Sequence, residues 1–285
     1  MVVDQSDDTR TRAIADSFAA FLPNLNYRHS HLKGKCRACN IGIDATEGDI
    51  VAFLDHDCTV QPDWLVQVAN TFERHPGAAL VFGSLVAPPG RTGFASDGWI
   101  PEGIVKVERE ANVADSTHDH AIIPLLIGYG ACMYVRRDAI QRIGPFDVHF
   151  GPGARFGGSE DADYAYRILM KGYSIARTPT IVIEHHGFRD YESGAASRHI
   201  RDYAYSNGAW QMKALRSRDI FALLWIASQT PVYLHFVNMH NLIHGRGPTG
   251  LAHIVMYIRG LIDSFQLGVD LRLSLYVARS ARWLR

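Results

Sequence analysis

The sequence predicts an α/β fold in which a mostly parallel sheet is flanked by helices and followed by a helical C-terminal region. Short apolar runs alternate with helical patterns up to about residue 186, an order typical of a parallel sheet. Residues 50–54 form a continuous apolar run bounded by charge, as a buried parallel strand does. We therefore expect an α/β part over residues 1–190 and a helical part over residues 191–285.

The expected elements of the α/β part can be given in chain order. Its first half has a strand at 1–3, a helix with Ile14, Phe18 and Phe21 on its apolar face, a strand at 25–29, a helix to about 45, the strand at 50–54, a helix from Pro62 to about Arg74 and a strand at 78–85. Residues 86–120 form a long connection. Its second half has a strand at 131–135, a helix at 137–142, a turn at 144–147, a glycine-rich loop at 151–158, a helix from Glu160 to Lys171 capped by Ser159, and short strands at 173–176 and 181–184.

Composition excludes several classes of protein. The 285 residues are 47% apolar and carry 29 Lys+Arg against 29 Asp+Glu, a globular balance that excludes a disordered tail, a coiled coil and a collagen-like repeat. A net charge of zero argues against a nucleic-acid binder. The charge is nevertheless unevenly distributed. Residues 195–285 hold 11 basic and 4 acidic side chains, which leaves 18 basic and 25 acidic side chains for residues 1–194.

Cysteines and the N-terminus indicate a reduced, cytoplasmic protein. Four cysteines in a chain of this length do not make a disulfide scaffold. Cys36 and Cys39 form a C-x-x-C, but no second pair follows at zinc-finger spacing, so we expect reduced and mostly buried thiols. Residues 1–8 have neither a basic start nor a long apolar core, unlike a signal peptide.

Two carboxylates follow the apolar run at residues 50–54. Ligands of open α/β sheets bind beyond the carboxyl ends of the strands, where Asp55 and Asp57 would lie. Two carboxylates at such an edge can share a divalent cation, Mn²⁺ or Mg²⁺, together with the groups that it bridges. The alternative is a solvated turn, because D-x-D is a common pattern.

A second group of acids opens a helix directly after the glycine-rich loop. Glu160, Asp161 and Asp163 lie at a helix N-terminus, where the helix dipole favours negative charge. This effect accounts well for one acid but poorly for three, so one of them is a candidate general base. His185 ends a predicted strand, and an imidazole at the same edge as Asp57 is a competent ligand for a Mn²⁺-like metal. The alternative for His185 is a structural role.

Residues 55–60, D-x-D-x-T-V, resemble the first motif of haloacid-dehalogenase-like phosphatases, in which Asp55 would be the nucleophile. Those enzymes usually carry this motif on the first strand of the domain, and they need a later lysine and an acidic pair after another strand. Here two strands and two helices are expected before Asp55, and the later acids open a helix. The phosphatase interpretation is therefore the weaker one.

A longer series of motifs resembles family 2 glycosyltransferases with the GT-A fold, over residues 2 to about 190. The series comprises residues 2–8 (V-V-D-x-S-x-D), 34–42 (G-K-x-x-A-x-N-x-G), 48–57 (G-D-I, an apolar run and D-x-D) with 62–65 after it, 130–147 ending in G-x-F-D, Glu160-Asp161 with Arg167 and Gly172 after it, and 179–185 (P-x-I-x-I-x-H). Six ordered matches are more specific than any one of them.

The resemblance implies an inverting, metal-dependent transfer of a sugar from a nucleoside diphosphate donor to an acceptor hydroxyl, in the synthesis of a polysaccharide, glycolipid or other cell-envelope glycan. Asp161 would be the general base, with Glu160 and Asp163 as supporting acids. The donor-binding residues would be Asp4, Lys35 and Asp55, and the metal ligands would be Asp57 and His185.

The chain departs from the family pattern at its start. The family has another strand and helix before V-V-D, so the resemblance implies an N-terminally incomplete catalytic part. A mis-assigned start, a fragment, and a degenerate relative that binds nucleotide sugars without catalysis all stay open.

The helical part suits two interpretations. Residues 249–267 are amphipathic, and Arg272, Arg279, Arg282 and Arg285 follow them together with Trp283, which is typical of a helix at a membrane surface. Such a helix would place the protein on the inner face of the plasma membrane, beside a lipid-linked acceptor. The alternative is a helix pair packed on the α/β part with a solvated basic end.

Overall fold

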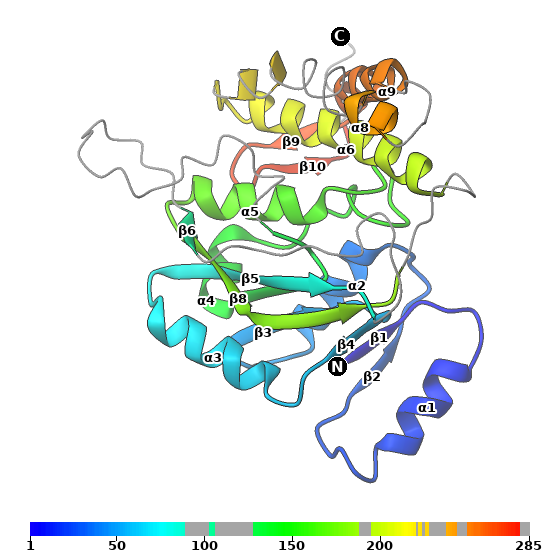
Figure 1. Ribbon diagram of the computed structural model, residues 1–285, viewed down its shortest axis with the longest axis vertical. Helices are drawn as coiled ribbons and strands as arrows, with labels where there is room; N and C mark the ends of the chain where they lie inside the picture. The colour runs from blue at the N-terminus through cyan, green and yellow to red at the C-terminus, as the bar shows by residue number, and fades with distance from the viewer. Residues whose placement is uncertain are drawn as a thin grey trace.

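In the computed structural model a central sheet lies between helices, and further helices are stacked beyond one of its faces (Figure 1). The structure describes residues 1–88, 103–105, 128–187, 195–220, 222–223, 226–227, 238–243 and 250–279. The predicted α/β fold with a C-terminal helical region is confirmed. Most of the expected connection at 86–120 lies outside the described residues.

The described elements follow the chain in an order close to the expected one. They are β1 (Val2–Asp4), α1 (Arg10–Phe18), β2 (Tyr27–His29), α2 (Lys35–Asp44), β3 (Ile50–Leu54), β4 (Cys58–Val60), α3 (Trp64–Arg74), β5 (Ala78–Val86), β6 (Gly103–Val105), β7 (Cys132–Arg136), α4 (Arg137–Ile143), α5 (Glu160–Met170), β8 (Ser174–His185), α6 (Ala195–Arg216), α8 (Asn238–Ile243), α9 (Gly250–Asp263), the 3₁₀ turn η3 (Ser264–Gln266), β9 (Gly268–Asp270) and β10 (Leu275–Val277).

The central sheet is mixed. Its strands lie in the order β3-β7-β5-β8-β4, and β6 also pairs with β8. β3, β5 and β8 run in one direction, whereas β7, β4 and β6 run in the other, so the sheet is not mostly parallel. β3 pairs antiparallel with β7 and buries only Phe53, which corrects its prediction as a buried parallel strand. β1 and β2 form a separate parallel pair.

Alternation along the strands divides the core between the two faces of the sheet. On β5, Leu80 and Phe82 pack toward α2, α4 and α5, whereas Val81 packs toward α3. On β7, Met133 and Tyr134 face opposite cores in the same way. This period of two is what a strand covered on both faces requires.

Four local predictions were wrong. β4 was not expected, and the two short strands expected after Gly172 form the single strand β8. The expected C-terminal helix gives way to the antiparallel β9–β10 hairpin, which carries Arg272 in its turn, and Arg282, Trp283 and Arg285 lie outside the described residues. The predicted apolar face of α1 is exposed, with Ile14, Phe18 and Phe21 open to solvent.

Ser159 does not cap α5 as predicted. It lies before the helix in the left-handed conformation, φ 60°, and makes no side-chain capping bond. Its buried hydroxyl instead contacts the Ser206 hydroxyl at 2.8 Å and donates to Asn207 Oδ1 at 2.7 Å, both on α6. The start of α5 is thus held by the C-terminal helices.

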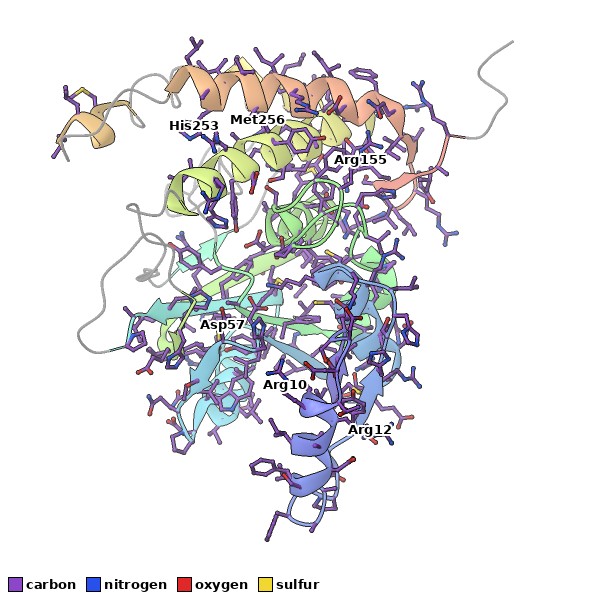
Figure 2. The ribbon with its side chains drawn as sticks, turned by 90° about the vertical axis from the view of Figure 1, so that its right-hand side faces the viewer. Arg10, Arg12, Asp57, Arg155, His253 and Met256 are labelled. Carbon is purple, nitrogen blue, oxygen red and sulfur yellow. The ribbon has the colours of Figure 1, made fainter. Side chains whose placement is uncertain are left out.

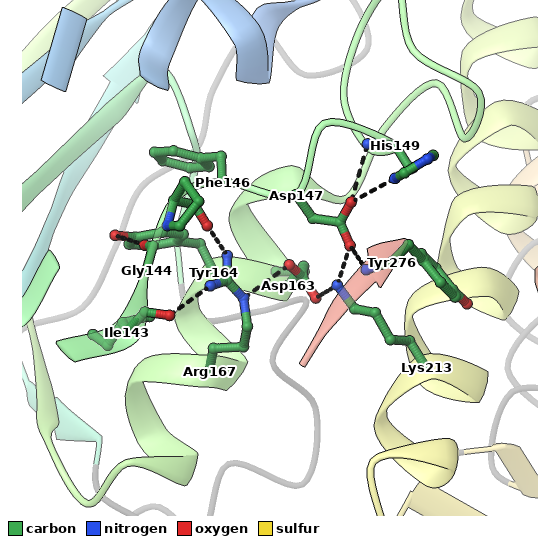
Figure 3. A network of polar contacts seen from close by, with 12 residues as sticks. Ile143, Gly144, Phe146, Asp147, His149, Asp163, Tyr164, Arg167, Lys213 and Tyr276 are labelled. Carbon is green, nitrogen blue, oxygen red and sulfur yellow. Dashed lines mark hydrogen bonds and ion pairs between the residues drawn. The ribbon is translucent and has the colours of Figure 1, made fainter. Parts of the chain in front are cut away.

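A buried ion cluster joins the same two parts of the chain (Figure 3). Lys213 of α6 lies 2.7 Å from Asp147 Oδ2 and 2.6 Å from Asp163 Oδ1, and all three side chains are 1% exposed. Arg167 contacts the other oxygen of Asp163 at 3.2 Å, and the Tyr276 backbone N–H donates to Asp147 at 2.8 Å. Two cations and two carboxylates therefore balance inside the protein.

Replacing the central cation should destabilise the protein strongly. Lys213→Met leaves Asp147 and Asp163 buried with one cation fewer, so we expect the free energy of unfolding to fall by about 3–5 kcal/mol in chemical denaturation. Arg259→Met is the control, because it removes an i,i+4 pair whose arginine is 66% exposed, and it should cost less than about 1 kcal/mol. Equal losses in the two variants would contradict this account.

The same cluster predicts a pH dependence of stability. Although burial opposes its charge, Lys213, with His149 and the Tyr276 N–H, holds the pKa of Asp147 well below its usual range. A depressed carboxyl pKa stabilises the fold above the unfolded value of about 4, and that stability is lost as the pH falls toward the folded value. In Lys213→Met, burial without the neighbouring ammonium would raise the pKa of Asp147 and favour its protonated form. The difference in free energy of unfolding between the wild type and this variant should therefore decrease as the pH is lowered toward about 4. A constant gap in pH-dependent denaturation would count against the cluster.

Candidate active site

Acidic and imidazole side chains meet at one edge of the central sheet because the strands that carry them end there. β3 and β8 run in the same direction, so Asp55 after β3 and His185 at the end of β8 share this edge. β4 turns back beside β8 and places Cys58 opposite His185. The His186 backbone N–H donates to the Asp57 carbonyl at 2.7 Å, which fixes the corner between them. Figure 2 shows Asp57 in the middle of the molecule.

Asp57, Cys58 and His185 form a group of potential metal ligands. Each offers one donor atom, and the three atoms lie within 4.8 Å of one another. Asp57 Oδ1 is 3.6 Å from His185 Nε2 and 4.0 Å from Cys58 Sγ. His185 faces Asp57 with its Nε2, and its Nδ1 is buried without a hydrogen-bond partner in the part of the chain that the structure describes. The residues fit a divalent cation.

Sequence reasoning missed Cys58 as a member of this group. The available signal was its position next to Asp57, but only the strand pairing of β4 with β8 brings it to His185. Burial, followed by the charges of Asp55 and Asp57, raises the pKa of the Cys58 thiol to about 12. A bound cation would have to displace that proton before the sulfur could serve as a thiolate ligand.

Lys35 joins two of the predicted site residues. Its ammonium lies 2.8 Å from both carboxylate oxygens of Asp55 and 3.3 Å from Glu160 Oε1. Burial disfavours the charged amine, but Glu160 and Asp55 outweigh burial and raise the pKa of Lys35 well above its usual value. Burial also raises the pKa of Glu160, against the opposing charge of Lys35. The start of α2, the end of β3 and the start of α5 are therefore held together by one cation.

Asp161 stands beside this triad in a fixed orientation. Its Oδ2 accepts the Gly130 backbone N–H at 2.9 Å, and its Oδ1 accepts the Ala162 N–H at 2.8 Å. It is partly exposed, unlike Glu160 and Asp163 on the same turn. A carboxylate that is oriented by backbone donors and still reachable is suited to accept a proton from a bound molecule.

Asp4 and Asp163 are placed apart from these groups. The carboxylate of Asp4 accepts the Ser6 N–H at 2.8 Å and the Tyr27 hydroxyl at 2.7 Å, within the β1–β2 unit. Burial opposes its charge, but these donors lower the pKa of Asp4. Asp163 belongs to the buried ion cluster with Lys213 and not to the accessible edge.

A family model described as glycosyl transferase family 2 matches residues 1–144, which is half of the chain. Two curated relatives are similar over longer stretches. "Glycosyltransferase AglE" of Haloferax volcanii is 26% identical over 228 residues, which are 79% of this chain and 68% of the relative. "Succinoglycan biosynthesis protein ExoM" of Rhizobium meliloti is 28% identical over 187 residues, which are 63% of this chain and 53% of the relative.

A solved structure shares the fold. It is described as mannosyltransferase PcManGT from Pyrobaculum calidifontis in complex with GDP-Man and Mn²⁺, and it matches with a TM-score of 0.53 and 17% identity over 95% of this chain and 67% of that chain. At this identity the likeness concerns the fold alone.

The ligand group predicts how cation binding should respond to substitution. Asp57→Asn removes the charged oxygen donor and should weaken Mn²⁺ binding, measured by isothermal titration, by about tenfold or more. Cys58→Ser should abolish the thiolate charge-transfer absorption that Co²⁺ develops with the wild type. Glu184→Gln is the matched control, because this neighbouring carboxylate on β8 pairs with His186 at 3.2 Å, outside the group. Equal loss of Mn²⁺ affinity in Glu184→Gln would contradict the assignment.

Proposed function

The chain belongs to glycosyl transferase family 2, and we propose that it moves a sugar from a nucleoside diphosphate donor to an acceptor hydroxyl, with inversion at the anomeric carbon and with the help of a divalent cation. The donor class is supported by the GDP-Man complex of the structural neighbour. The observation that carries the proposal is the Lys35 ammonium between Asp55 and Glu160, because Asp57 follows Asp55 by two residues and Asp161 directly follows Glu160.

Asp161 is the proposed general base. It would accept the proton of the acceptor hydroxyl while that oxygen bonds to the anomeric carbon, and the bond from this carbon to the diphosphate oxygen breaks. The hydrogen bonds from Gly130 and Ala162 hold the carboxylate in place and leave lone pairs on both of its oxygens. Attack from the side opposite the leaving group inverts the configuration.

The donor side is proposed to lie between Lys35 and the ligand group. Asp57, Cys58 and His185 would hold the cation, which when bound supplies positive charge to the diphosphate of the leaving group. A nitrogen and a sulfur donor favour Mn²⁺ over Mg²⁺, which prefers oxygen. Lys35 would keep Asp55 oriented toward the donor ribose or sugar, and Asp4 would contact the base through the end of β1.

The acceptor is proposed to be a glycan or a lipid-linked glycan of the cell envelope. One relative is named as a succinoglycan biosynthesis protein, which supports glycan synthesis as the setting. The phosphatase alternative for residues 55–60 is set aside, because the family match includes them. The remaining alternative is a relative that binds nucleotide sugars without transferring them.

Replacing the base should separate chemistry from binding. Asp161→Asn keeps the size of the side chain but removes its basicity, so we expect sugar transfer, followed as release of the nucleoside diphosphate, to fall about 10²–10⁴-fold with donor affinity nearly unchanged. Asp138→Asn is the matched control, because Asp138 accepts the N–H of the next residue at 2.8 Å in the first turn of α4, as Asp161 does in α5.

Two outcomes would contradict the proposal. Full transfer by Asp161→Asn would remove this residue from the mechanism. Donor binding without transfer by the wild type, across nucleotide sugars and acceptors with Mn²⁺ present, would favour the non-catalytic alternative.

A further inference from the structure

Helix α9 has one face bound tightly to α6. His253, Tyr257 and Gly260 are buried on this face. A Cβ on Gly260 would lie 1.9 Å from the Tyr205 carbonyl oxygen, and one on Gly208 would lie 2.1 Å from the Tyr257 carbonyl oxygen. The two helices therefore touch backbone to backbone, which only glycine permits. This contact holds α9 in one rotation about its axis, with its other face turned outward.

The outward face of α9 and of the η3 turn that follows it is largely apolar. Five residues spaced alternately by four and three form one stripe, which we call the α9 stripe: Leu251, Val255, Ile258, Ile262 and Phe265, with exposed fractions of 71, 56, 46, 62 and 46%. The preceding helix α8 also exposes Met239, Leu242 and Ile243. The outer face of a solvated helix is normally polar, and a continuous exposed apolar surface marks a binding surface.

The charges around the stripe are positive. From residue 220 to residue 262 the sequence has no Asp or Glu. The nearby acids are engaged: the Asp219 carboxylate accepts the Tyr166 hydroxyl, and that of Asp263 accepts the Tyr205 hydroxyl and contacts Arg259. Arg259 is 66% exposed between stripe residues and pairs with Asp263, which is 19% exposed. The Arg216 guanidinium donates to the Ser264 and Leu267 carbonyls and lies 5.1 Å from the centre of the Phe265 ring. The α9 stripe, with Arg259 and Arg216 beside it, is complementary to a surface that has an apolar interior and anionic groups at its boundary.

We propose that the α9 stripe lies on the surface of a membrane that contains anionic lipids, with its apolar side chains among the acyl chains and Arg259 at the level of the phosphates. The helix is the amphipathic one expected from sequence, whereas Arg272 and Arg279 do not continue it but lie in and after the β9–β10 hairpin. Among the helices of the described residues none is long and apolar enough to cross a bilayer.

The stripe is connected to the candidate active site through the glycine-rich loop. Arg155 of this loop donates to the Asp263 carbonyl at 3.4 Å and to Gln266, directly after α9. The loop also accepts the Lys35 backbone N–H at the Pro152 carbonyl, at 3.0 Å. A membrane-bound α9 would hold this loop near the lipid surface, which suits a lipid-linked acceptor. That consequence rests on the proposed function, whereas the docking itself does not.

Vesicle binding of the full chain tests the proposal without any donor or acceptor. Wild-type protein should co-sediment with vesicles of phosphatidylcholine and phosphatidylglycerol, and less with phosphatidylcholine alone. The variant Val255→Ser, Ile258→Ser, Ile262→Ser should bind the mixed vesicles at least about tenfold more weakly, because insertion scales with the buried apolar area. Its thermal unfolding should match the wild type, since all three side chains point outward.

The control uses the other exposed apolar helix. Phe18 and Phe21, in and just after α1, are 51 and 79% exposed, and α1 lies at the end of the molecule opposite α9 (Figure 2). Phe18→Ser, Phe21→Ser should leave vesicle binding unchanged. Vesicle binding by the stripe variant at the wild-type level, or equal weakening in both variants, would overturn the proposal. So would a dimer-to-monomer change in the stripe variant with vesicle binding intact, because the stripe would then bind a second copy.

Discussion

The placement of Lys213 between Asp147 and Asp163 is the constraint on which the rest of the structure depends. A lone ammonium that is 1% exposed would cost far too much free energy to remain charged, and so would either carboxylate. Each of these buried charges is tolerated only because the opposite charges lie beside it. Lys213 comes from α6, Asp147 from the turn after α4 and Asp163 from α5. The cluster therefore requires α6 to pack against α5 and the turn after α4.

This constraint reaches the proposed catalytic base through one turn of helix. Asp163 lies two residues after Asp161, so the cluster that satisfies Asp163 also fixes the turn that carries the base. From the same side, Ser206 and Asn207 hold Ser159 in its left-handed conformation. From the sheet side, Lys35 holds Glu160. The first turn of α5 is thus held by both parts of the chain, and the base between these anchors needs only two backbone N–H groups to complete its orientation.

The sequence predicted the residues of the candidate site better than it predicted the connections between them. Asp55 and His185 were expected at one edge because each follows an apolar strand, and the shared direction of β3 and β8 brings them there. Cys58 had only its position next to Asp57 as a signal, because the pairing of β4 with β8 could not be predicted. Lys213 had none, because a lysine in a helix belongs to no motif. The predicted capping role of Ser159 was wrong because a serine before an acidic helix start is the usual capping pattern. Its hydroxyl instead forms hydrogen bonds with α6, and these tertiary contacts could not be predicted from the local sequence. The mixed sheet was missed because β7 reads as an ordinary apolar strand, and strand direction is set by long-range pairing.

The charge balance of the chain now has a spatial interpretation. The net charge is zero, but the acidic excess lies in residues 1–194, where several carboxylates gather at the sheet edge, and the basic excess lies in residues 195–285. Part of that basic excess is used internally: Lys213 neutralises acids of the α/β part, Arg216 donates to backbone carbonyls, and Arg259 pairs with Asp263. The loop that contains Pro152 and Arg155 contacts both α2, beside the sheet edge, and the end of α9. The proposed cation site and the proposed membrane-binding face are therefore linked through one segment of the chain. A soluble donor and a surface-bound acceptor could then reach one site from different sides, and the fold that keeps Lys213 buried would also keep that geometry constant.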